Sequence, residues 1–114
     1  MYCFEKLKLN KDFRRIYGRG GSFVNPAFVT YALKNRSGNI RIGITVSKKI
    51  GCAVERNRAK RVITAAFAKC APFVKPGYDF VFVARTRILC KKSGEIAADM
   101  LNNLRDVGAL KEDA

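Results

Sequence analysis

The run Phe80-Val-Phe-Val-Ala84 contains no polar side chain and follows a Pro76-Gly77 turn. A short apolar run rich in aromatic and β-branched residues favours a strand, and its uninterrupted hydrophobicity favours a central strand that is covered on both faces. A second segment, residues 40–47, alternates apolar with polar residues, so a strand there would have one apolar and one polar face. The chain is therefore constrained to build a sheet with other layers packed against it.

Three helices are predicted to supply those layers. The first has Asn10 as its N-cap and ends within residues 18–20, where two glycines stop it. The second begins just after Gly51 and ends before Pro72, because proline disfavours helical geometry in the preceding residue. The third is capped by Ser93. The buried stripes of the second and third helices are Ala59, Val62, Ile63, Ala66, Phe67 and Cys70, and Ile96, Met100, Leu101, Leu104 and Val107.

These elements predict one α+β domain spanning residues 1–114. Three strands are expected between the first two helices and one between the last two, which gives the order α-β-β-β-α-β-α. Residues 27–33 and 40–46, joined by a turn at residues 35–39, read as an antiparallel hairpin. The predicted fold is thus a set of helices packed on a mostly antiparallel four-stranded sheet.

The charge of the chain indicates a polyanionic partner. Its 114 residues carry 23 Lys and Arg against 9 Asp and Glu, a net charge of +14. Such an excess is self-repulsive in a compact fold, and binding to a polyanion relieves the repulsion and releases counterions. Nucleic acid is the first candidate and an anionic membrane surface the second. Only two of the basic residues lie after position 94, so the binding face is expected before it.

Several classes of protein are disfavoured. No apolar run approaches the roughly 20 residues of a membrane-spanning helix, and the N-terminus lacks the apolar core of a signal peptide. The cysteines are scattered and histidine is absent, so we expect reduced thiols in a cytoplasmic protein and no metal site; they are Cys3, Cys52, Cys70 and Cys90.

The acidic residues argue against a protein-only nuclease. Only Glu5, Asp12, Glu55 and Asp79 precede residue 95, and they are scattered, whereas acid–base or two-metal chemistry needs clustered carboxylates or histidine. No catalytic residue is therefore predicted. Double-stranded DNA is also a weak candidate, because no helix-turn-helix or zinc-finger pattern occurs.

The densest basic segment, residues 47–61, predicts an RNA-binding helix face. It holds six Lys and Arg residues and a single acid, Glu55. Uncompensated like charges one turn apart destabilise a helix, which argues against an ordinary solvated face. Guanidinium groups match phosphate geometry, and the Asn57 amide can both donate to and accept from a ribose hydroxyl. The predicted binding set is Arg56, Asn57, Arg58, Lys60 and Arg61.

Aromatic residues on the first helix suggest a second site. Phe13 and Tyr17 lie one turn apart and share a face, as a stacking platform for single-stranded RNA requires. The same spacing suits a core helix, so Phe13 is open between cleft and core, whereas the tyrosine hydroxyl favours exposure. Phe67, Phe80 and Phe82 are assigned to the core.

The chain resembles the bacterial ribonuclease P protein family. The resemblance is carried by the run Ile42-Gly-Ile-Thr-Val-Ser-Lys-Lys-Ile-Gly-Cys-Ala-Val-Glu-Arg-Asn-Arg-Ala-Lys-Arg61, centred on Arg56-Asn-Arg58. Leu9-Asn-Lys-Asp-Phe13, with Tyr17 and Gly20, and Phe28-Val-Thr-Tyr31 are similar to further segments of the family. The resemblance as a whole covers about residues 7–105.

The resemblance implies a non-catalytic subunit whose large RNA partner uses bound Mg²⁺ to remove the 5′ leader of precursor tRNA. The arginine-rich helix would meet that RNA. A cleft between the sheet and the first helix would receive the leader, with Phe13, Tyr17 and Tyr31 inside it and Lys48 and Lys49 at its lip. It further implies a left-handed βαβ crossover, no organic cofactor and no obligate protein partner. The alternative is a ribosomal-type or chaperone RNA-binding protein without a role in cleavage.

Overall fold

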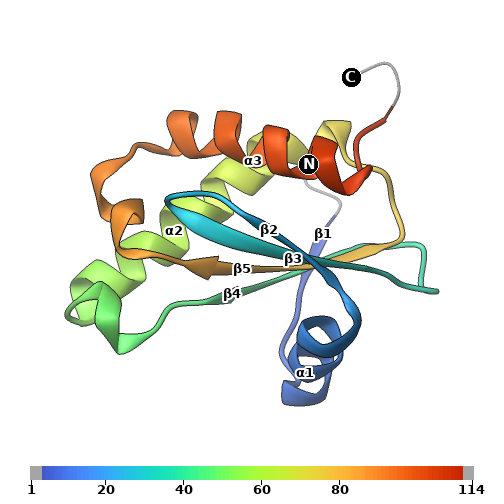
Figure 1. The fold of residues 1–114 in the computed structure, drawn as a ribbon, viewed down its shortest axis with the longest axis horizontal. Coiled ribbons are helices and arrows are strands. Elements are labelled where there is room, and N and C mark those ends of the chain that lie inside the picture. The colour runs from blue at the N-terminus through green and yellow to red at the C-terminus, as the bar shows by residue number, and fades with distance from the viewer. Residues whose placement is uncertain (1–3, 112–114) are drawn as a thin grey trace.

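The computed structural model describes residues 4–111, which form five strands and three helices (Figure 1). Short 3₁₀ turns follow β4, α2 and β5 at Lys48–Ile50, Ala71–Phe73 and Thr86–Cys90. The longer elements are β1 (Phe4–Lys6), α1 (Asn10–Arg19), β2 (Gly21–Val24), β3 (Phe28–Lys34), β4 (Ile40–Thr45), α2 (Ala53–Cys70), β5 (Tyr78–Ala84) and α3 (Ser93–Val107). The predicted order of helices and strands is confirmed from α1 onward.

The sheet differs from the prediction in strand number and direction. Its order is β1-β4-β5-β3-β2, with β1–β4 and β4–β5 parallel and β3–β5 and β2–β3 antiparallel. The predictions of four strands and of a mostly antiparallel sheet were therefore wrong. The hairpin of residues 27–33 with 40–46 was also wrong, because β5 lies between β3 and β4. The parallel neighbours β4 and β5 are joined through α2, which makes a βαβ unit.

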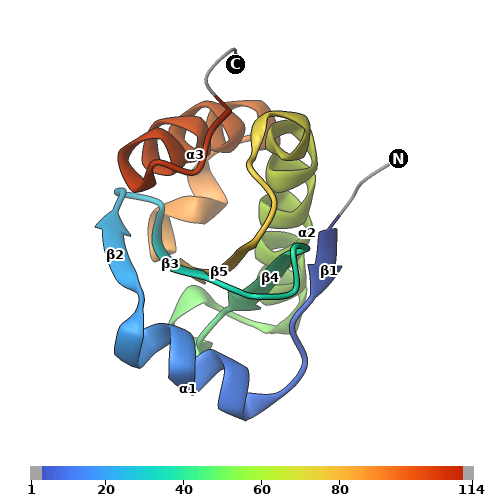
Figure 2. The ribbon, with the colours of Figure 1, turned by 90° about the vertical axis from the view of Figure 1, so that its right-hand side faces the viewer.

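The central position of β5 follows from its apolar sequence, as predicted. Phe80 and Phe82 are fully buried on the face that α2 and α3 cover, and Val81 is buried on the opposite face against α1. Figure 2 shows the three layers, with α1 on one side of the sheet and α2 and α3 on the other. Phe67 of α2 packs against both phenylalanines, at ring-centroid distances of 5.8 and 5.6 Å. The three core assignments are confirmed.

The helix boundaries agree with the sequence to within a residue. The second helix begins at Ala53 and ends at Cys70, ahead of Pro72, as predicted. Asn10 and Ser93 were wrong as N-caps, because Leu9 and Lys92 hold those positions and each predicted cap is the first helical residue. The Ser93 hydroxyl accepts from Lys69 Nζ at 3.4 Å instead, and assignments of helix ends commonly differ by one residue.

The cysteines of the described region are free thiols. Cys70 is buried, and burial raises the pKa of its thiol to about 11, so it behaves as a small apolar residue. Cys52 and Cys90 are exposed, and Cys3 lies outside the described residues. None of the helices described here is both long and apolar enough to cross a membrane.

Candidate nucleic-acid interface

The outer face of α2 carries the predicted cationic residues. Because the buried stripe of Ala59, Ile63 and Phe67 turns toward the sheet, the opposite side of the helix is left in solvent. The side chains of four residues on that side make no hydrogen bond or ion pair with residues 4–111, so the three positive charges among them are unpaired. These exposed residues are Asn57, Arg58, Lys60 and Arg61.

Arg56 is placed differently from its neighbours. It is half-buried, and its Nε atom is buried without a hydrogen-bond partner among the described residues. An unpaired buried donor costs about 1–3 kcal/mol, so this placement of Arg56 lowers the stability of the fold. Lys48 and Lys49 are exposed in the turn that leads from β4 to α2. The start of α2 is therefore positively charged on several sides.

Tyr17 forms an aromatic pair on the other side of the sheet. Its ring meets Tyr31 of β3 edge-on, with centroids 4.9 Å apart and planes at 88°. Its hydroxyl hydrogen-bonds Thr45 Oγ1 of β4 at 2.7 Å, and 38% of the residue remains exposed. Tyr17 is thus held in one orientation while part of its ring faces solvent.

Phe13 packs against the core on one side and is exposed to solvent on the other. It is half-buried and packs beside Leu7 and Ile16, and its ring lies directly against the backbone of β4 at Gly43. A Cβ atom at Gly43 would come within 2.5 Å of two ring carbons of Phe13. The absence of a side chain at Gly43 therefore allows the ring to lie on the sheet.

A groove runs between α1 and α2 along the edge of β4. It consists of three neighbouring hollows of about 400, 200 and 390 Å³, and Lys60 lines all three. The strand β1 pairs with β4 only as far as Lys6 opposite Ile42, so β4 is open on that side beyond this point. The groove passes from Tyr17 over Phe13 toward β1.

The groove unites some predicted site residues and separates others. Phe13 and Tyr17 line it together with Lys60 and Arg61, which the sequence had grouped with the other predicted RNA-binding residues of α2. Tyr31 packs edge-on against the Tyr17 ring. Lys48 and Lys49 line none of the three hollows of the groove. Sequence reasoning assigned none of the further lining residues to the site, among them Lys6, Gly43, Thr45 and Thr64. The glycine inside a strand was the available signal, because such a glycine often marks close approach of another group.

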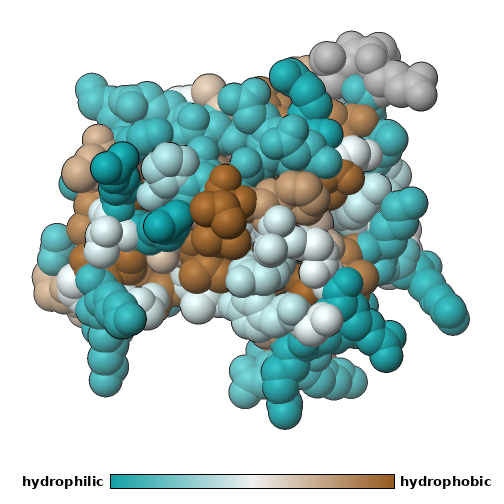
Figure 3. Space-filling model, viewed as in Figure 1, coloured by the Kyte–Doolittle hydropathy of each residue, from teal (hydrophilic) through white to brown (hydrophobic). Residues whose placement is uncertain are grey.

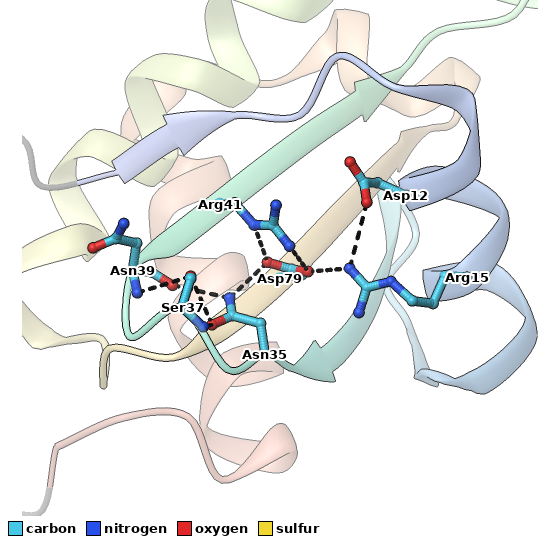
Figure 4. A network of polar contacts seen from close by, with 7 residues as sticks. All are labelled: Asp12, Arg15, Asn35, Ser37, Asn39, Arg41 and Asp79. Carbon is cyan, nitrogen blue, oxygen red and sulfur yellow. Dashed lines mark hydrogen bonds and ion pairs between the residues drawn. The ribbon is translucent and has the colours of Figure 1, made fainter.

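A buried carboxylate fixes α1 to the sheet. Asp79 of β5 is fully buried and accepts two hydrogen bonds from Arg41, through Nε and Nη2, at 2.8 Å each (Figure 4). It also accepts from Asn35 Nδ2 and from Arg15 Nη2 of α1, both at 2.7 Å. Burial alone would raise the pKa of Asp79, but the hydrogen bonds from Arg41, Asn35 and Arg15 outweigh it and lower that pKa. The position of the groove wall therefore depends on an acid that sequence reasoning had treated as isolated.

Comparisons with known proteins agree with this architecture. The family model for Ribonuclease P matches residues 1–108. The ribonuclease P protein component of Clostridioides difficile is 50% identical over 80 residues, which are 69% of this chain and 70% of that protein. The Clostridium botulinum protein of the same name is 40% identical over 104 residues, 90% and 94% of the two chains. The Staphylococcus aureus RNase P protein superimposes with a TM-score of 0.81 at 33% identity, covering 93% of this chain and 97% of that one. This chain belongs to the ribonuclease P protein family.

Proposed function

We propose that this chain is the protein subunit of ribonuclease P and assists removal of the 5′ leader from precursor tRNA in the cytoplasm. The observation that carries the proposal is that two different RNA-binding surfaces meet at Lys60 and Arg61. One is the uncompensated cationic face of α2, and the other is the groove with aromatic side chains. A ribosomal-type or chaperone protein would have no need of this combination.

The α2 face is assigned to the catalytic RNA. Arg58 and Arg61 are exposed and unpaired, so their guanidinium groups are available to phosphate oxygens without breaking a contact within the protein. Half-buried Arg56 adds a further positive charge beside them, and the exposed Asn57 amide can hydrogen-bond a ribose hydroxyl. Screening of closely spaced phosphates by these charges would allow Mg²⁺ to bind the RNA at lower concentration.

The groove is assigned to the single-stranded leader. Unstacked bases bind aromatic faces beside a cationic groove, and the part-exposed rings of Phe13 and Tyr17 with Lys6 and Lys60 provide that combination. Tyr31 contributes by holding Tyr17. Lys48 and Lys49, at the start of α2, are proposed to attract leader phosphates at the entrance. Precursor tRNA would then bind more tightly than mature tRNA, which has no leader.

Magnesium is assigned to the RNA. Within residues 4–111, no three His, Cys, Asp or Glu side chains lie close enough together to hold a metal ion. Asp79, the one fully buried carboxylate of that region, is already occupied by two arginines and an asparagine. Mg²⁺ is usually held by one or two carboxylates together with water and phosphate oxygens, so we propose that the phosphates of the RNA supply most of its ligands.

The proposal is tested by cleavage of precursor tRNA with a bacterial ribonuclease P RNA at low magnesium concentration. We expect added protein to stimulate cleavage and the protein alone to cleave nothing. A folded, RNA-binding protein that gives no stimulation would instead support the ribosomal-type or chaperone function.

Replacing Tyr17 by alanine should weaken precursor tRNA binding about tenfold and leave mature tRNA binding unchanged. A stacked base contributes about 1–3 kcal/mol, and 1.4 kcal/mol corresponds to a factor of ten. The measurement is the affinity of the assembled ribonucleoprotein for both RNAs. Tyr17→Phe is the matched control, because it keeps the ring and removes only the hydrogen bond to Thr45. Equal losses for precursor and mature tRNA would contradict a leader site.

Replacing Gly43 by alanine should lower precursor affinity several-fold by moving the Phe13 ring off the sheet. Gly94→Ala serves as control, because the nearest atom to its new Cβ is the flexible Lys69 Nζ, 4.0 Å away. Affinity for the catalytic RNA should stay the same in both variants. Unchanged precursor affinity in Gly43→Ala would show that the Phe13 ring does not form part of the site.

A further inference from the structure

A second basic cluster lies on the opposite side of α1 from the groove. Helical spacing places Asn10, Phe13 and Tyr17 on the groove side, and Arg15 and Arg19 face the other way. There α1, the end of β3 and the loop between β3 and β4 enclose a hollow of about 510 Å³. Its cationic lining residues are Arg15, Arg19, Lys34, Arg36 and Arg41.

Two of these arginines are held rigidly. Arg15 and Arg41 bind the buried Asp79, while 32% and 26% of their side chains remain exposed. Arg41 uses Nε and Nη2 for Asp79, and Figure 4 shows its remaining terminal nitrogen pointing away from that carboxylate. A long side chain that becomes ordered when it binds a ligand loses conformational entropy. Arg15 and Arg41 are already ordered in the folded protein, so this cost of binding is reduced for them.

The other three cations have no partner. The side chains of Arg19, Lys34 and Arg36 make no hydrogen bond or ion pair with residues 4–111, and all three are exposed. The nearby carboxylates Asp12, Asp79 and Glu5 offset at most three of the five positive charges. Figure 3 shows hydrophilic side chains projecting over α1 and over the β3–β4 loop. The cluster therefore carries excess positive charge that a bound anion would neutralise.

The lining of this hollow indicates which anion fits. It contains no aromatic residue, and Leu33 is its one clearly apolar side chain, so it has no platform on which an unpaired base could stack. Double-helical RNA presents phosphates and ribose hydroxyls outward and keeps its bases inside. We infer that this cluster, Arg15, Arg19, Lys34, Arg36 and Arg41, binds the sugar–phosphate backbone of a double-helical RNA segment.

The position of the cluster makes it a separate contact. Its member Arg41 lies near the start of β4, whereas Thr45 at the end of that strand leads into the basic turn before α2. Four strand steps separate these residues, about 13 Å, and Figure 1 shows the β3–β4 loop and the start of α2 at opposite ends of the sheet. One RNA surface can thus bind α2 while a duplex segment binds here.

The test compares Arg19→Ala/Arg36→Ala with a control pair that also removes two exposed cations, Lys92→Ala at the N-cap of α3 and Arg105→Ala within α3. Each protein is titrated with a 16-base-pair RNA duplex and with a single-stranded oligoribonucleotide over a range of salt concentrations. Neither pair touches Asp79, so circular dichroism should show both variants folded.

We expect Arg19→Ala/Arg36→Ala to weaken duplex binding about tenfold and to reduce the salt slope by about 2, one for each lost phosphate contact. Single-strand binding and the control pair should be unaffected. Unchanged duplex binding, an equal effect in the control, or a loss confined to single strands would overturn the inference. Cleavage of precursor tRNA tests the proposed function separately, so either can fail alone.

Discussion

Replacing Asp79 by asparagine is expected to lower the free energy of unfolding by about 3 kcal/mol. Removing one partner of a buried ion pair costs roughly 3–5 kcal/mol, because the other charge loses its compensation. The partial exposure of Arg15 and Arg41 places the effect at the lower end of that range. Asparagine preserves the shape of the side chain, so charge is the main change. Urea unfolding at neutral pH measures the difference.

Asp12→Asn is the matched control for this variant. Asp12 also pairs with Arg15, but at 3.7 Å and within one turn of the same helix. Such pairs contribute less than about 1 kcal/mol. Equal destabilisation by the two variants would show that Asp79 has no special role in holding α1 to the sheet.

The pH dependence gives an independent check. Because the pKa of Asp79 is lowered by folding, its carboxylate stabilises the folded state at every pH above its ordinary value of 3.8. That contribution is lost as pH falls from there toward the folded-state pKa. The stability difference between the wild type and Asp79→Asn should therefore shrink below about pH 4. A difference that stays constant down to pH 2 would contradict the ion-pair explanation.

The sequence predicted the parts of the fold that depend on local periodicity. The stripe from Ala59 to Cys70 located α2, and the uninterrupted run around Phe80 located the central strand. It could not order the strands, because β5 enters between β3 and β4 through pairs of residues 38 to 56 positions apart. The strand β1 has three residues, too few to show any period.

Of the candidate site, only the part that depends on local helical periodicity was predictable from the sequence. A helical wheel is enough to place Arg58 and Arg61 on a solvent face. The groove depends on the hydrogen bond between Tyr17 and Thr45. The position of α1, which forms one wall of the groove, depends on the contact of Arg15 with Asp79, 64 positions away. One signal was present: a lone carboxylate beside a strand of buried aromatics requires a cationic partner, because burying an unpaired charge is very costly.

Replacing both Arg56 and Arg58 by alanine is expected to weaken binding to ribonuclease P RNA about a hundredfold. Hydrogen bonds to charged groups contribute about 1.5–3 kcal/mol each, so two of them account for about 3 kcal/mol or slightly more. Both residues lie off the buried stripe of α2, so the fold should persist. The measurements are RNA affinity over a range of salt concentrations and cleavage at low magnesium, with Lys92→Ala/Arg105→Ala as the control.

The magnesium dependence and substrate preference of this variant separate docking from leader binding. If α2 holds the catalytic RNA, cleavage by the double variant should recover when its concentration or that of magnesium is raised, since both compensate for weaker assembly. The preference for precursor over mature tRNA should then be intact, because the groove is unchanged. Tyr17→Ala should do the reverse, with normal assembly and a lost preference. Loss of preference in the arginine variant at saturating protein would show instead that α2 contacts the leader, and that Lys60 joins one continuous surface rather than two.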